Sequence, residues 1–274
     1  MLRKEHTLMA EPGSRILVLP DCHYPNHDAD SIDLVLRAAK DIGVTSAIHL
    51  GDLLDFYSVS RWEKDPNISA EVGEVADEVR SAIPLFNYLN SLKNGWIWLE
   101  GNHEVRFKSY VSKSPTLRSL GYTVKKLLNE VDPTILSNCV YLESDYRLVL
   151  NPSTVIEHGH GMARALRPKA EYCLLDDYPE QTSIIGHTHK IFDAHKTVHG
   201  RSGVPIIRSV YSVGHLSDET KQNFAKDPKW QEGFMVITVY LDTMRGYRYD
   251  YHQVVIVKDE QGRPSFTLWG KVYK

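Results

Sequence analysis

The sequence predicts an α/β protein in which two mixed β-sheets pack face to face and helices flank them. Three observations lead to this prediction. Short apolar runs alternate with helical patterns over the first two thirds of the chain. A polar motif follows each run, as ligand-binding residues do at the strand ends of open α/β sheets. The last third is rich in β-branched and aromatic residues separated by turn residues, which is typical of antiparallel strands.

Five short, mostly apolar runs are predicted to be buried strands. They cover residues 16–19, 46–50, 96–99, 154–156 and 183–185. An aspartate, asparagine or histidine follows the end of each run within three residues. Because the loops after such strands converge on one crevice, these polar side chains are expected to lie close together.

Helical patterns lie between these runs. In residues 30–39 apolar residues recur with the i, i+3, i+4, i+7 spacing, behind the capping candidates Asp30 and Ser31. Residues 72–79 repeat this spacing, and Pro84 is expected to interrupt that helix. Residues 125–128 are also predicted to be helical. The chain is therefore expected to alternate strands and helices up to the fifth motif.

Three segments after residue 186 are predicted to be antiparallel strands of the second sheet. They are residues 206–213, 234–241 and 247–257. No linker, repeat or low-complexity tract divides the chain. We therefore expect residues 15–274 to form a single domain, preceded by an N-terminal tail over residues 1–14.

Composition excludes some classes of protein. The formal net charge of −3 over 274 residues gives no global attraction to nucleic acid or to an anionic membrane, although a local basic groove stays open. No apolar stretch approaches a membrane span or a signal peptide. The three cysteines show no CxxC pairing, so no disulfide framework is expected. These features predict a reduced, cytoplasmic protein without a membrane partner.

The most informative feature is a set of five short motifs in a fixed order. They are Asp21-Cys22-His23, Gly51-Asp52-Leu53-Leu54-Asp55, Gly101-Asn102-His103-Glu104, His158-Gly159-His160 and Gly186-His187-Thr188-His189. Together they offer carboxylate, amide and imidazole donors, which suit manganese, iron, zinc or nickel better than a thiolate-seeking metal. Each residue alone could be an ordinary polar residue at a strand end. As an ordered set they predict a two-metal hydrolase site.

The order of these motifs resembles that of the calcineurin-like metallophosphoesterase superfamily over residues 15–215. The compact form is similar to bacterial and phage members, and implies a four-layer α-β-β-α sandwich in a bacterial or phage-infected cell. The resemblance implies two divalent metal ions, with Mn²⁺ the first expectation and Fe, Zn or Ni the alternatives. It assigns Asp21, His23 and His189 to the first ion, Asn102, His158 and His187 to the second, and Asp52 to both.

The resemblance also implies a mechanism. A hydroxide shared by the two ions would attack phosphorus, and the ions would stabilise the charge on the phosphoryl oxygens. His103 would protonate the leaving oxygen, and Asp55 would orient His103. Glu104 is expected to have a structural role rather than a catalytic one.

Three further residues are candidates for substrate binding. Arg106 and Arg164 are the cations nearest to the motifs, and His160 follows the fourth motif closely. Each could equally be a solvated surface residue. The stretch from Arg106 to Lys113 is a weak candidate for nucleic-acid binding and is as easily the solvated face of a helix.

Two positions at which this chain differs from the protein phosphatases of the superfamily narrow the expected class of substrate. Protein Ser/Thr phosphatases of the superfamily carry glycine and arginine where this chain has Tyr24 and Phe56. The expected substrates are therefore phosphate esters, foremost phosphodiesters of nucleotides or nucleic acid. The alternative within the same class is a phosphomonoesterase acting on nucleotides or phosphoproteins. A non-catalytic scaffold with the same fold is the alternative from another class, and no protein partner is predicted.

Overall fold

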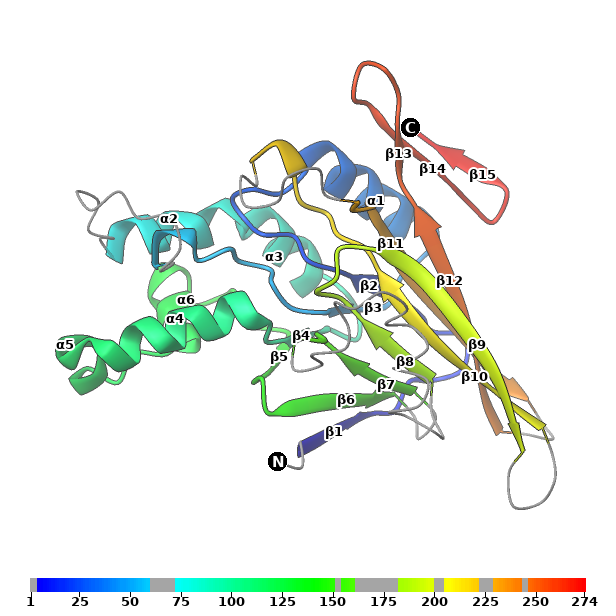
Figure 1. The fold of residues 1–274 in the computed structure, drawn as a ribbon, viewed down its shortest axis with the longest axis horizontal. Coiled ribbons are helices and arrows are strands. Elements are labelled where there is room, and N and C mark those ends of the chain that lie inside the picture. Colours follow the sequence, from blue (N-terminus) through cyan, green and yellow to red (C-terminus); the bar gives the residue numbers. More distant parts are fainter. Residues whose placement is uncertain are drawn as a thin grey trace.

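Two mixed six-stranded β-sheets form the centre of the computed structural model (Figure 1). The described residues are 4–59, 72–150, 154–160, 182–199, 205–221, 229–242 and 246–274. Apolar side chains of both sheets meet in one buried cluster, which includes Ile48 from one sheet and Ile156 from the other. The sheets therefore pack face to face, and the predicted α/β class with flanking helices is confirmed.

The first sheet, here the β3 sheet, holds the strands that precede the first three motifs. In spatial order its strands are β12 (Gly246–Val255), β11 (Gly233–Asp242), β2 (Arg15–Leu19), β3 (Ser46–His49), β4 (Trp96–Leu99) and β5 (Cys139–Leu142). Strands β2, β3, β4 and β5 are mutually parallel. Their carboxyl ends therefore lie along one edge of the sheet.

The second sheet, here the β7 sheet, holds the strands that precede the last two motifs. Its order is β1 (Lys4–Leu8), β6 (Tyr146–Leu150), β7 (Thr154–Glu157), β8 (Thr182–Ile185), β10 (Pro205–Val213) and β9 (Ile191–His199). Strands β7 and β8 are parallel, so their following loops emerge together. A small third sheet contains β13 (Val257–Lys258), β14 (Pro264–Leu268) and β15 (Lys271–Tyr273).

Helices cover the outer face of the β3 sheet. They are α1 (Ala29–Asp41), α2 (Val72–Ser81), α3 (Ile83–Asn90), α4 (Asn102–Lys113), α5 (Pro115–Ser119) and α6 (Val124–Val131), with short 3₁₀ helices η1 (Tyr57–Val59) and η3 (Glu219–Lys221). The predicted helices are confirmed, and Pro84 lies in the first turn of α3, where its missing N–H costs nothing. The cap of α1 is Asp28 rather than Asp30 or Ser31, because its side chain accepts a hydrogen bond from the Ser31 N–H at 2.8 Å.

Two predictions about strands are wrong. The expected tail over residues 1–14 contains β1, which pairs in parallel with β6 and extends the β7 sheet. The three C-terminal strands do not form a sheet of their own: β10 joins β8, whereas β11 joins β2 in the β3 sheet. Propensity identifies a strand, but burial and neighbours decide which partner it pairs with.

Aromatic side chains dominate the core beneath the helices. Trp98 of β4 is fully buried between Phe86 of α3, at a ring-centroid distance of 5.7 Å, and Tyr141 of β5, at 5.1 Å. This packing fixes β4, which carries the third motif at its carboxyl end. None of the helices in the described ranges is long and apolar enough to cross a membrane.

Replacing Trp98 by Ala is expected to lower the free energy of unfolding by about 3–5 kcal/mol, because the change leaves a large cavity in this cluster. Urea denaturation followed by far-ultraviolet circular dichroism measures the loss. Trp269→Ala is the control, because that tryptophan is 45% exposed, and its cost should stay within about 1 kcal/mol. Equal costs for the two variants would contradict the assignment of Trp98 to the core.

Candidate metal centre

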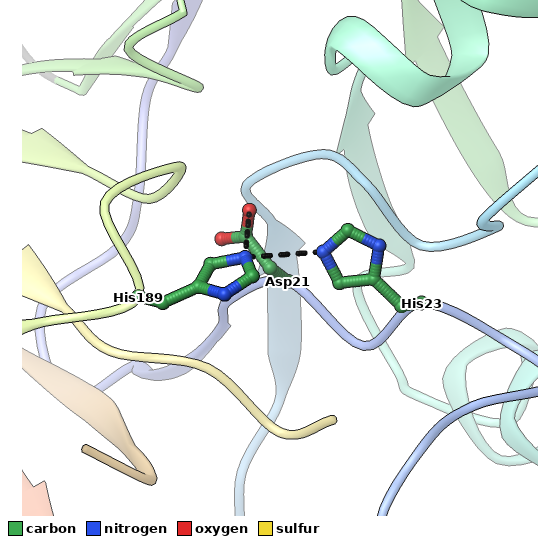
Figure 2. A group of neighbouring side chains, drawn as sticks. All are labelled: Asp21, His23 and His189. Carbon is green, nitrogen blue, oxygen red and sulfur yellow. Dashed lines mark hydrogen bonds and ion pairs between the residues drawn. The ribbon is translucent and has the colours of Figure 1, made fainter. Parts of the chain in front are cut away.

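Three side chains from distant parts of the chain form the first cluster at the strand ends (Figure 2). Asp21 and His23 follow β2, and His189 follows β8. The Nε2 atoms of His23 and His189 face each other at 3.1 Å, and Asp21 Oδ1 lies 3.6 Å from His189 Nε2. All three side chains are buried. Two imidazole nitrogens and a carboxylate oxygen thus converge on one point, as the ligands of a divalent cation do.

The second cluster contains Asp52, His158 and His187. Asp52 Oδ2 lies 3.3 Å from His158 Nε2, and Asn102 Oδ1 lies 3.0 Å from the same nitrogen. His158 Nδ1 lies 3.0 Å from the carbonyl oxygen of Leu50, to which its N–H donates. A neutral His158 therefore presents a lone pair at Nε2 toward oxygen atoms that are themselves acceptors.

Acceptor atoms that face one another repel unless a proton or a cation lies between them. Burial disfavours the imidazolium form of His158, but the carboxylate of Asp52 outweighs burial and raises the pKa of His158 to about 9. A bound divalent cation removes the same repulsion, and the Leu50 carbonyl already holds the ring with Nε2 toward the cluster. The residues present therefore fit a metal ion.

The two clusters adjoin each other. The backbone N–H of His187 donates to both carboxylate oxygens of Asp21, at 3.1 and 3.0 Å. Asp52 Oδ1 accepts a hydrogen bond from the backbone N–H of His103 at 2.8 Å. The structure groups Asp52 with His158 and His187, and its predicted role as a bridge to the first cluster stays a prediction.

Backbone conformation at the clusters is unusual. Four predicted ligands have positive φ angles: 55° at His23, 50° at Asp52, 65° at His187 and 56° at His189. Residues other than glycine rarely adopt this left-handed conformation, which costs of order 1–3 kcal/mol each where it persists. Such outliers concentrate at functional sites, where the surrounding structure holds them in place.

The motif glycines let the loops approach each other. A Cβ atom on Gly101 would lie 2.2 Å from Asp52 Oδ1, and one on Gly186 would lie 2.6 Å from Asp21 Oδ2. Gly51 has a φ of 112°, and a Cβ there would lie 2.7 Å from His158 Nδ1. Each of these glycines therefore makes room for a different predicted ligand.

Glu104 ties two of the motif loops together. Its carboxylate accepts hydrogen bonds from the N–H groups of Asp52, Leu53 and Leu54 in the second motif, and from that of Gly101 in the third. These bonds measure 2.8–3.2 Å. Burial, with a further contribution from Asp52, raises the pKa of Glu104 to about 7. This geometry agrees with the structural role expected for Glu104.

His103 lies between the second cluster and Asp55. Its Nδ1 lies 2.6 Å from Asp55 Oδ1, and its Nε2 lies 3.8 Å from Asp52 Oδ2. Burial disfavours the charged ring, but Asp52 and Asp55 outweigh burial and raise the pKa of His103. Arg106 Nη2 lies 3.0 Å from His103 Nε2, and Asn26 donates to Asp55 Oδ2 at 2.9 Å. His103 is thus oriented by a carboxylate and lies close to a cation.

The remaining candidates for substrate binding have different positions. Arg106 lies at the site, one turn into α4. The ring of His160 lies beside those of His158 and His187, at centroid distances of 5.3 and 6.3 Å. Arg164 lies outside the described residues.

Sequence reasoning missed several side chains behind the ligands. His215 stacks on His189 at a centroid distance of 5.2 Å, and Trp230 packs its ring against His189 at 4.4 Å. His49 is buried beneath the site, where its Nδ1 accepts from the Gly51 N–H at 3.2 Å. Burial lowers the pKa of His49 to about 3, so this ring is neutral. A histidine at the end of a short buried strand was the available signal for His49.

Replacing Glu104 by Ala is expected to lower the free energy of unfolding by about 3 kcal/mol, because four buried N–H groups lose their acceptor. Urea denaturation of the metal-free protein measures this cost. Glu74→Ala, at an exposed position of α2, is the control and should change stability by at most about 0.5 kcal/mol. A Glu104 variant as stable as the Glu74 variant would show that the two loops do not depend on this carboxylate.

Comparison with known proteins places the fold and the motifs in one family. The family model described as calcineurin-like phosphoesterase matches residues 14–229, a range that includes all seven predicted metal ligands. The Gene 54 proteins of Mycobacterium phages D29 and L5 are each 27% identical to the chain, over 234 and 239 residues. Each match covers 83% of this chain and 89% of the relative.

Solved structures with a similar arrangement include two proteins of low sequence identity. Vps29 from Chaetomium thermophilum gives a TM-score of 0.45 at 12% identity, covering 95% of this chain and 97% of its own. Yfce, a phosphoesterase from E. coli, gives 0.39 at 13% identity, covering 91% and 96%. The family model, which spans most of the chain and every predicted ligand, decides the assignment. The chain belongs to the calcineurin-like phosphoesterase family.

Proposed function

We propose that this protein is a phosphodiesterase that uses two divalent metal ions. Asp21, His23 and His189 would hold one ion, and Asn102, His158 and His187 the other, with Asp52 shared between them. The observation that carries this proposal is the convergence of the two clusters at adjoining strand ends. Mn²⁺, Fe, Zn and Ni all suit this donor set, and Mn²⁺ is our first choice.

Bound ions would supply Lewis-acid stabilisation of the phosphoryl oxygens and lower the pKa of a water molecule at the site. The protein's own contribution is to hold the ligands in place and to supply a proton to the leaving group. Because the site is walled by buried side chains, its charges act in a low dielectric, where they are stronger than in water.

His103 is the proposed proton donor. Asp55 accepts the Nδ1–H and thereby stabilises the imidazolium, so that Nε2 keeps a proton to give to the departing oxygen. Nε2 faces the second cluster, 3.8 Å from Asp52 Oδ2. The proton is thus available on the side where the ester would bind.

Arg106 is proposed to bind a phosphoryl oxygen. A guanidinium can only donate, so its 3.0 Å contact with His103 Nε2 exists while that nitrogen is unprotonated. When Nε2 carries the proton, the guanidinium must find another acceptor, and its side chain is a quarter exposed, so it can reach a substrate. Phe56, at the position where protein phosphatases carry arginine, is buried and stacks on Phe107 at 5.1 Å. With a buried ring there instead of a cation, the site favours a singly charged diester over a doubly charged monoester. His160 is proposed to assist substrate binding beside the second cluster.

Two other functions are compatible with the same fold, and the experiments must distinguish them from a phosphodiesterase. A phosphomonoesterase would use the same residues on a different substrate, and a non-catalytic scaffold would use the fold alone. The intact set of ligand residues supports the catalytic reading. The phage relatives support action inside a phage-infected bacterial cell, in the cytoplasm.

The first experiment compares hydrolysis of bis-p-nitrophenyl phosphate and p-nitrophenyl phosphate by chelator-treated protein reloaded with Mn²⁺. The diester is expected to have the higher kcat/KM, and chelation should abolish both activities. Faster monoester cleavage would favour the phosphomonoesterase. No cleavage with Mn, Fe, Zn or Ni would favour the scaffold.

Replacing His103 by Ala should lower kcat by about 10²–10⁴-fold on a diester with a poor alkoxide leaving group, because the proton donor is lost. The loss should be smaller with p-nitrophenolate, which leaves without protonation, while metal content measured by mass spectrometry stays unchanged. Asp52→Asn should lose metal as well as turnover. His199→Ala, at an exposed strand end, is the control. Normal turnover of the His103 variant on the diester with the poor leaving group would contradict the assignment of His103 as proton donor.

A further inference from the structure

Helix α4 presents two different faces. Its buried face, with Glu104, Phe107 and Val111, packs toward the β3 sheet. Its outer face begins at the metal centre with Asn102 and continues with Arg106, Ser109 and Lys113, which are spaced like one stripe of a helix. At 1.5 Å per residue this stripe is about 16 Å long. Because Asn102 is the first residue of α4 and Lys113 the last, the stripe leads from the candidate metal centre to the end of the helix that joins α5 (Figure 1).

This part of the chain carries a strong positive charge. Residues 105–129 contain six lysines and arginines and no aspartate or glutamate. Because the whole chain has a net charge of −3, the rest of it carries −9. The positive charge is thus concentrated in the segment that begins beside the metal centre. Local charge of this kind attracts polyanions even when the whole protein is acidic.

Arg106 Nη1 lies 3.7 Å from Asp55 Oδ1, whereas the two cations farther along the outer face have no carboxylate partner among the described residues. Lys108, which points elsewhere, forms ion pairs with Glu100 and Glu143 at 2.8 and 3.0 Å. Lys113 and Arg118 form no ion pair within the described part of the chain, and both are exposed. Arg118 of α5 donates to the Ser112 carbonyl at 3.4 Å, which brings its guanidinium to the end of α4.

Other helices of the same protein do not share this pattern. On α1, Arg37 pairs with Asp33 at 2.9 Å, and on α2, Arg80 pairs with Asp77. Those helices carry charges of both signs, which is typical of a solvated helix face. The outer face of α4 differs because its segment lacks the carboxylates that would balance its cations.

An exposed aromatic ring lies in η1, which contacts α4 and closely follows the second motif. Tyr57 of η1 is 53% exposed, and it follows Asp55 by only two residues. Helix α4 contacts η1, and Phe56 next to Tyr57 stacks on Phe107 of α4. Cations along a helix together with an exposed ring are the combination by which proteins hold single-stranded nucleic acid, through phosphate contacts and base stacking.

We propose that Arg106, Lys113 and Arg118 bind the phosphodiester backbone of single-stranded nucleic acid and lead it to the metal centre, where Tyr57 stacks on a base. This proposal rests on the phosphodiesterase function proposed above and names its substrate class. A single strand fits better than a duplex, because the metal ligands are buried and a duplex is stiff over the length of this face. It fits better than an acidic peptide because Tyr57 offers a base-stacking surface.

The test measures binding of a fluorescein-labelled oligothymidylate to the full-length, metal-free protein by fluorescence anisotropy at several salt concentrations. The variant is K113Q/R118Q, and K40Q/K93Q is the control, since Lys40 and Lys93 are exposed and precede β3 and β4 at the opposite edge of the sheet. We expect the first variant to raise Kd about tenfold near 0.15 M salt. Its slope of log Kd against log salt should fall by about 1.4, since each single-strand phosphate contact contributes about 0.7.

Hydrolysis of bis-p-nitrophenyl phosphate by the Mn²⁺-loaded K113Q/R118Q variant should stay within about twofold of the parent protein, because both changes lie far from the reacting atoms. Tyr57→Ala should also weaken oligonucleotide binding, whereas Tyr57→Phe, which keeps the ring, should not. If the parent protein cleaves no model ester but K113Q/R118Q still loses oligonucleotide binding, the proposed function fails and this binding surface stands.

Three results would overturn the proposal. The first is oligonucleotide binding by K113Q/R118Q that equals that of K40Q/K93Q. The second is equal competition by polyglutamate of matched charge, which would assign the face to an acidic protein. The third is tighter binding of a duplex than of a single strand through the same residues.

Discussion

The contact between the second motif and the start of α4 is the constraint on which the site depends. Gly101 approaches Asp52 so closely that a single Cβ atom would collide with its carboxylate. Glu104 then accepts N–H groups from both segments, and the His103 N–H binds Asp52. Without this contact Asp52 would not face His158, and the second cluster would not exist. Strand pairing within the β3 sheet brings β3 and β4 side by side, but the loop contact decides where the predicted ligands that follow them point.

This arrangement has an energetic cost that the fold must offset. Carboxylates and imidazole lone pairs are gathered in a buried space, and four of the predicted ligands have left-handed backbone conformations. Burying charged groups is favourable only when partners replace the lost water. Hydrogen bonds from backbone N–H groups to Asp21 and Asp52 provide part of that replacement, and bound cations would provide the rest. Apolar packing between the two sheets, and between the β3 sheet and its helices, therefore offsets the free-energy cost of a site that would be unfavourable by itself.

Much of this could be predicted from the sequence, because the motifs follow short buried strands and parallel strands place their ends together. The positions of Asp21 and Asp52 at one edge follow from that rule, because β2 and β3 are parallel neighbours. His158 follows β7 of the other sheet, and the packing of the two sheets brings it to Asp52. The partners of β10 and β11 could not be predicted, since their residues fit either sheet equally well. The positive φ angles of His187 and His189 could not be predicted either. Histidine adopts this conformation more often than most residues, but no local pattern marks which histidines do so. The position of His49 at the end of a buried strand could be predicted, but its hydrogen bond with the Gly51 N–H depends on the loop conformation.

The two parts of α4 differ in what they can bind: its N-terminus offers backbone N–H groups, and its outer face offers cationic side chains. A helix N-terminus favours negative charge, and here its free N–H groups are already used by carboxylates of the protein. The His103 N–H donates to Asp52 and the Gly101 N–H to Glu104. Buried as it is, Asp52 would have a raised pKa, but the neighbouring His158 and His103 hold its pKa well below the usual range. The helix dipole thus stabilises the charge of a predicted metal ligand rather than a substrate phosphate. The proposed phosphate contacts are therefore made by side chains on the outer face, of which Arg106 is the first beyond the candidate metal centre.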